Sequence, residues 1–211
     1  MTDRTQASLD GNPFASHRTR PGVLEFCFPA GVSAESLVNQ LSRHHWRGQI
    51  VGPHGVGKST LIAALLPELH RREICTRAVA LHDGQRRLPV GFLKSHNLGG
   101  KLVFIVDGYE QLSYLERLKL SWHCWLCGRG LLITTHSPAV RLMTLLTPVP
   151  SAALMTHLMH KLQGGSEPLV NDHAASVSFF RHGGNLREVW FDLYDQYERN
   201  RRQPVKVRQR P

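Results

Sequence analysis

The sequence lacks a long apolar run, an apolar leader segment and a cysteine framework. No stretch of its 211 residues approaches the ~20 apolar residues of a membrane-spanning helix, and residues 1–18 lack the apolar region of a secretory signal. The cysteines are too few for a disulfide scaffold, namely Cys27, Cys75, Cys124 and Cys127. We therefore expect a cytoplasmic protein with reduced thiols and no membrane span.

Charged residues are also fewer than usual, at 20% of the chain, while apolar residues make up 41%. These fractions lie within the globular range and exclude a wholly disordered or collagen-like chain. A chain of this length buries roughly 70% of its unfolded surface, so it needs neither disulfides nor a metal to hold a core. We expect one domain, or one domain with a small appendage.

Acidic residues are missing from the C-terminal end. The chain has 26 Lys and Arg against 16 Asp and Glu, for a formal net charge of +10, and residues 199–211 contain several basic side chains without one acid. This segment predicts a disordered basic tail, which either binds nucleic acid through counterion release or is only a solvated end. Residues 1–21 are polar, contain Gly and Pro, and predict a flexible N-terminal arm.

The body of the chain alternates apolar strand patterns with helical ones. Strands are expected at 46–51, 74–81, 101–107, 130–135 and within 141–149, with an edge strand at 23–29. Helices are expected at 33–44, 60–71, 111–126 and 151–162 and on both sides of Gly183–Gly184, and Pro67 is expected to kink or end its helix. Such βαβ units predict a three-layer α/β fold with a mainly parallel sheet of about five strands in residues 22–150 and a small helical extension in 151–198.

A glycine-rich loop carries the strongest functional signal. Residues 52–59 fit the phosphate-loop pattern GxxxxGK[ST], after a predicted strand and before a predicted helix. The glycines let several backbone N–H groups point at one anion, and the helix adds its N-terminal dipole. Lys58 can contact the β- and γ-phosphates, and the Ser59 hydroxyl can bind Mg²⁺. The predicted nucleotide-binding residues are Gly52, Pro53, His54, Gly55, Val56, Gly57, Lys58, Ser59 and Thr60.

No acid follows directly after the acidic end of the third predicted strand. Residues 103–107 read Val-Phe-Ile-Val-Asp, so Asp107 ends an apolar strand as the magnesium-holding Walker B aspartate does. Position 108, where many ATPases carry a glutamate, is glycine. Glu110 is therefore our candidate for the base that activates water, and the alternative is an acid that complements a helix dipole.

Three further features are candidates for the site. Thr135 ends a predicted parallel strand, where it either contacts the γ-phosphate or the attacking water, or only caps the strand. Arg187 opens a helix after a glycine turn, where it either reaches the nucleotide phosphates or pairs with a nearby acid. Cys124 and Cys127 form a lone CxxC, which we interpret as apolar packing at a helix end instead of a zinc or redox site.

Together these segments resemble the P-loop ATPases of the AAA+ and STAND kind. GPHGVGKST resembles their Walker A, VFIVDGYEQL resembles the NACHT-type Walker B, LLITTHSP resembles a sensor 1 strand, and GGNLRE is similar to the sensor 2 helix of enhancer-binding AAA+ activators. The resemblance spans about residues 47–190 and implies that Arg187 is a sensor 2 arginine and that the last two helices form a reduced lid. The chain departs from the pattern at Gly108, at His136, where NACHT-type proteins usually have Arg, and in having no evident arginine finger.

The motifs predict a Mg²⁺-dependent ATPase that hydrolyses the β–γ phosphoanhydride of ATP to drive a conformational switch. The guanine-reading Asn/Thr-Lys-x-Asp motif is missing, which favours ATP over GTP. Two alternatives stay open, namely a nucleotide-dependent switch or adaptor with little hydrolysis, and a small-molecule kinase with a basic lid in residues 83–95. The expected ligands are ATP and Mg²⁺, and self-association, a protein partner and nucleic acid at the basic tail stay open as partners.

Overall fold

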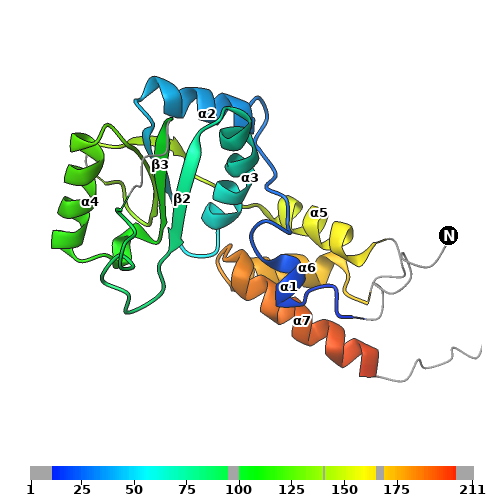
Figure 1. Ribbon diagram of the computed structural model, residues 1–211. Coiled ribbons are helices and arrows are strands. Elements are labelled where there is room, and N and C mark those ends of the chain that lie inside the picture. Colours follow the sequence, from blue (N-terminus) through cyan, green and yellow to red (C-terminus); the bar gives the residue numbers. More distant parts are fainter. Residues whose placement is uncertain (1–10, 95–99, 140, 165–168, 203–211) are drawn as a thin grey trace, which may run out of the picture. The chain divides into compact units, whose positions relative to one another are not determined.

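The computed structural model describes residues 11–94, 100–139, 141–164 and 169–202 (Figure 1). The chain forms two compact units, one from Glu25 to Val149 and the other from the chain up to Leu24 together with the chain from Pro150 onward. Much of the predicted N-terminal arm (1–10) and of the predicted basic tail (203–211) lies outside the described residues. No described helix has the length and apolarity needed to span a bilayer.

The unit from Glu25 to Val149 is built around a parallel five-stranded sheet with the order β2-β3-β4-β1-β5. The strands are β1 (Arg47–Val51), β2 (Cys75–Ala80), β3 (Leu102–Asp107), β4 (Gly130–Thr135) and β5 (Met143–Leu146). The predicted parallel α/β sheet is confirmed. Because β4 lies between β1 and β3, the carboxyl ends of these three strands are neighbours at one edge of the sheet.

Helices cover both faces of this sheet, as predicted. Val103 and Ile105 of β3 belong to a core shared with α2 (Ala34–Arg43) and α3 (Lys58–Arg71). The alternate residue Phe104 belongs to a second core that includes Leu120 of α4 (Tyr114–Leu126). Successive side chains of a strand point to opposite faces, so α4 lies across the sheet from α2 and α3, as Figure 1 shows.

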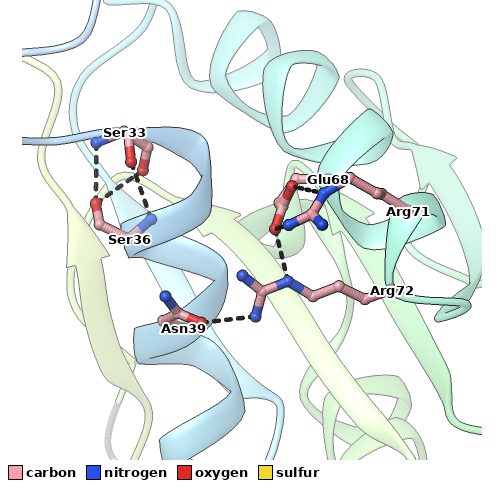
Figure 2. Close-up of polar contacts among 6 residues, drawn as sticks. All are labelled: Ser33, Ser36, Asn39, Glu68, Arg71 and Arg72. Atoms are coloured by element: carbon pink, nitrogen blue, oxygen red, sulfur yellow. Dashed lines mark hydrogen bonds and ion pairs between the residues drawn. The ribbon is translucent and has the colours of Figure 1, made fainter.

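Polar contacts fix the start of α2 and join α2 to α3 (Figure 2). The Ser36 N–H donates to Ser33 Oγ (3.1 Å), and the Ser33 N–H donates to Ser36 Oγ (2.9 Å), which forms a reciprocal cap. At the end of α3, Arg72 donates to Glu68 Oε1 (2.6 Å) and to Asn39 Oδ1 of α2 (2.7 Å). The hydrogen bond from Arg71, helped by Arg72, lowers the pKa of Glu68 to about 2.

The second unit is helical, with α1 (Ser16–Thr19), α5 (Ala152–Gln163), α6 (Asp172–Arg181) and α7 (Leu186–Arg202). Phe14 is buried in its core and stacks on Trp190 of α7, with ring centroids 6.1 Å apart. Asn12 donates to the carbonyl oxygen of Tyr194 (3.0 Å) and to Glu198 Oε1 (3.0 Å). The prediction of a flexible arm is therefore wrong for this part of residues 1–21, because Asn12 and Phe14 fasten it to α7.

The structure corrects four local predictions. The segment at 23–29 is no strand, because side-chain packing positions it, with Phe26 and Phe28 edge to face 5.0 Å apart. Pro67 does not end α3, which continues to Arg71 because Leu65 and Leu69 are buried on either side of it. A separate 3₁₀ turn, η1 (Tyr109–Gln111), precedes α4, which begins only after its cap Ser113. Residues 199–202 of the predicted tail are helical and end α7.

Candidate functional site

Two glycines with left-handed backbones shape the loop between β1 and α3. Gly55 has φ 73°, and Gly57, the N-cap of α3, has φ 97°. Residues with a side chain rarely adopt such angles, so the loop needs glycine at both positions. Because Gly57 carries no capping side chain, the first N–H groups of α3 receive no side-chain cap. These donors and the helix dipole suit an anion in front of α3.

The ammonium group of Lys58 lies over this loop. Lys58 is a buried lysine, with 9% of its surface exposed. Its Nζ donates to the carbonyl oxygens of Gly52 (2.5 Å) and Pro53 (2.7 Å). Charge-assisted bonds of this kind hold the positive charge against the inner side of the loop. The lysine is thus placed beside the backbone donors, as the phosphate-loop pattern predicts.

The end of β4 is fastened to the start of the loop. Val51 of β1 pairs with Thr135 of β4, and the Gly52 N–H donates to the Thr135 carbonyl oxygen (3.1 Å). The Thr135 hydroxyl is buried and donates to the Ser137 carbonyl oxygen (2.9 Å). This bond is the one expected of a strand-end cap. The hydroxyl oxygen still has lone pairs that can accept a hydrogen bond, so its contact with a γ-phosphate or an attacking water stays a prediction.

Thr134 holds the carboxylate of Asp107. Its hydroxyl donates to Asp107 Oδ1 (2.6 Å) and accepts the N–H of Gly108 (2.8 Å), and the side chain is fully buried. The sequence pattern favoured Thr135 over Thr134 only weakly, and it did not predict this contact. The strand register brings Thr134 to this position. Val106 of β3 pairs with Ile133 of β4, and the residues that follow them are Asp107 on β3 and Thr134 on β4.

Gly108 cannot carry a side chain in this fold. Its φ is +83°, and a Cβ added there would lie 2.8 Å from the carbonyl oxygen of Leu81. That distance is shorter than real Cβ contacts, and the obstacle is backbone. The position where many ATPases carry a glutamate is therefore closed to any acid. Instead, η1 begins directly after Gly108 and carries Glu110 as its middle residue.

Glu110 contacts His136, which follows the end of β4. Glu110 Oε1 lies 3.0 Å from His136 Nε2, and the ring of His136 lies edge to face on His54 of the phosphate loop, with centroids 3.7 Å apart. Burial lowers the pKa of His136, Glu110 raises it, and the charge of Lys58 and the neighbouring His54 lower it. A neutral ring that donates from Nε2 to Glu110 fits this geometry.

The second carboxylate oxygen of Glu110 differs from the first. Oε2 is buried, and no hydrogen-bond partner for it lies within the part of the chain that the structure describes. A buried carboxylate oxygen without a donor is costly and suggests a bound water or ligand group. The Glu110 backbone carbonyl also accepts a bond from Arg117 Nη2 (2.6 Å), which helps to fix η1.

The predicted residues divide between the two units. The phosphate loop, Asp107, Glu110 and Thr135 are joined by the contacts above at the carboxyl ends of β1, β3 and β4. Arg187 belongs to the other unit, where it is exposed in the first turn of α7. Its N–H donates to Asn185 Oδ1 (3.1 Å), so Asn185 caps this helix. The roles predicted for the Arg187 side chain stay predictions.

A magnesium ion suits the donors at this edge. Mg²⁺ is usually held by one or two protein oxygens together with water and substrate phosphates, and Asp107 and Ser59 are oxygen donors next to the phosphate loop. Among the residues that the structure describes, no group of three or more His, Cys, Asp or Glu side chains could form a complete metal cage. The two cysteines of the CxxC pair differ in their surroundings. Burial raises the pKa of Cys124 to about 12, whereas Cys127 is exposed at the end of α4.

Comparison with known proteins gives no family assignment. No protein-family model matches the chain, and no curated protein is significantly similar to it in sequence. A functional proposal therefore depends on the chemistry of the site itself.

Proposed function

We propose that this protein binds ATP with Mg²⁺ and hydrolyses the β–γ phosphoanhydride bond at the carboxyl ends of β1, β3 and β4. The observation that carries the proposal is the set of groups gathered at these strand ends. The left-handed glycine loop and the buried Lys58 lie beside an Asp107 held by Thr134 and beside Glu110, whose buried Oε2 has no hydrogen-bond partner among the described residues. These are the parts that phosphoryl transfer to water requires.

The loop supplies the phosphate-binding part. The N–H groups of the loop and of the first turn of α3 bind the phosphate oxygens, and Lys58 exchanges loop carbonyls for the β- and γ-phosphates. Ser59 and Asp107 would hold Mg²⁺, with Asp107 oriented by Thr134. When bound, Mg²⁺ neutralises charge on the β- and γ-phosphate oxygens.

Glu110 is the proposed base. His136 occupies Oε1, so Oε2 is the oxygen that accepts the proton of the attacking water. The water oxygen forms a bond to the γ-phosphorus, the bond to the bridging oxygen breaks, and ADP leaves with inorganic phosphate. His136 is a positioning residue, because it acts on the carboxylate and not on the substrate.

A second function is favoured by one observation. Position 108 is closed to an acid, so the base is displaced to a short 3₁₀ turn whose carboxylate already has a histidine partner. Such a site binds ATP and turns it over slowly, which describes a nucleotide-dependent switch or adaptor. The kinase alternative rests on the basic residues of 83–95 and gains no support from the contacts at the site.

Nucleotide binding and phosphate release by three variants test the proposal. Lys58→Ala should lose Mg²⁺-ATP binding, whereas Lys101→Ala, at the amino end of β3, should bind as the wild type does. Glu110→Gln should retain binding and lose phosphate release by about 10²-fold or more. Binding without release in the wild type would favour the switch. Binding that survives Lys58→Ala would contradict both functions.

A further inference from the structure

The outer face of α4 carries a row of large apolar side chains. Leu115, Leu118, Trp122 and Trp125 are all exposed, and the two tryptophans keep 64% and 67% of their surface accessible. Their spacing of three, four and three residues is the a/d spacing of a coiled-coil seam. The opposite face of α4 already packs on the sheet through Leu120 and Cys124. A helix that only covered a sheet would have polar residues in place of this second apolar row.

A groove adjoins this row and shares Leu118 and Trp122 with it. It is formed by α4 and by the segment 87–94, and its volume is about 1050 Å³. Leu118, Trp122 and Leu126 line it from α4, and Val90 stands fully exposed in the segment opposite. This volume slightly exceeds the usual range for small-ligand pockets, and it is large enough for several side chains of a docked helix.

The charges around the groove have mostly one sign. Among the described lining residues, Arg87, Lys94 and Lys119 are basic and Glu116 is acidic. Glu116 accepts the N–H of Leu88 (3.2 Å) and lies 3.6 Å from Lys119 Nζ, so its charge is already engaged. The groove therefore combines an apolar floor with a net positive rim, which complements an apolar surface flanked by carboxylates.

We propose that this groove binds an amphipathic helix of a partner protein whose apolar a/d side chains are flanked by Asp and Glu. The heptad row of α4 supplies one side of the seam, and the basic residues select the flanking charge. A second copy of this chain fits less well, because pairing through α4 would bring two positive rims together. The row's aliphatic members also favour a helix over single-stranded nucleic acid, which would use only the tryptophans.

The test uses the full chain and labelled synthetic peptides of about three heptads with Leu at a and d. One peptide has Glu at the flanking e and g positions, and the other has Lys there. Fluorescence anisotropy should show the acidic peptide binding at least about tenfold more tightly, a preference that weakens at high salt. Trp122→Ala combined with Trp125→Ala should abolish binding. The matched control is Phe191→Ala, which removes an exposed aromatic side chain from the other unit.

Charge reversal makes the test specific. Lys94→Glu combined with Lys119→Glu should reverse the preference, so that the basic peptide binds more tightly. Equal binding of the two peptides by the wild type, or no binding of either, would overturn the proposal. Binding of oligothymidine that is lost in the double tryptophan variant would identify a nucleic-acid surface instead. A dimer in sedimentation analysis that Leu118→Glu dissociates would identify a self-interface and would likewise overturn it.

Discussion

Replacement of Gly108 by alanine tests whether the backbone around position 108, directly after Asp107, excludes a side chain there. The substitution adds one methyl group, and it has two separable costs. At φ +83° a residue with a Cβ costs about 1–2 kcal/mol relative to glycine. The new Cβ would also lie 2.8 Å from the Leu81 carbonyl oxygen, an overlap that costs about 1–3 kcal/mol more. We expect Gly108→Ala to reduce the free energy of unfolding by about 2–5 kcal/mol.

Gly128→Ala is the matched control. Gly128 also has a left-handed backbone, with φ +60°, but nothing lies within 4 Å of a Cβ added there. It therefore pays only the conformational cost, about 1–2 kcal/mol. The difference between the two variants in urea unfolding isolates the overlap with Leu81. Equal losses of stability in the two variants would refute the argument that backbone closes position 108.

The closed position 108 also bears on activity. Gly108→Glu places an acid where many ATPases carry one, yet here it should lower phosphate release and not raise it. The overlap must move either Leu81 or the turn that leads to Glu110, and Gly108 also donates to the Thr134 hydroxyl that holds Asp107. Faster phosphate release by a folded Gly108→Glu protein would show that Glu110 is not the base.

Three further predictions concern single contacts. Thr134→Val should cost about 1–3 kcal/mol in urea unfolding and weaken Mg²⁺-dependent nucleotide binding, while Thr134→Ser should retain both, because only the hydroxyl holds Asp107. Burial lowers the pKa of His136, so the unfolded chain binds the proton more tightly. Stability should then fall as the pH drops from about 6.5 through the lower folded pKa, and this slope should be smaller in His136→Gln. Arg72→Ala should reduce stability by about 1 kcal/mol, and Arg71→Ala by less, because Arg71 is the more exposed of the two.

Local sequence patterns predicted the elements of the sheet unit well. The apolar runs of β3 and β4 and the glycine loop each depend on residues within a few positions of one another. Long-range packing was the part that such patterns could not predict. Phe14 is a single aromatic residue in a polar segment, so its stacking on Trp190 leaves no periodic signal.

The candidate site divides in the same way. The motif located Lys58 and Asp107, because the loop and the strand end are short, contiguous patterns. The pairing of Glu110 with His136 depends on two things that neither segment encodes alone, namely the neighbouring positions of β3 and β4 and the 3₁₀ turn that Gly108 permits. In the sequence, His136 was a departure from the NACHT-type pattern that the chain resembles, and its contact with Glu110 gives that departure a physical meaning.

The end of β4 connects the parts of the proposed site. Three consecutive residues there reach three different groups: Thr134 holds Asp107, the Thr135 carbonyl oxygen accepts from Gly52, and His136 lies between Glu110 and His54. A displacement of this strand end by the length of a hydrogen bond would therefore disturb the Asp107 carboxylate, the phosphate loop and Glu110 together. If ATP binds as proposed, the strand end is the element through which occupancy of the loop and the position of Glu110 depend on each other, because His136 contacts both.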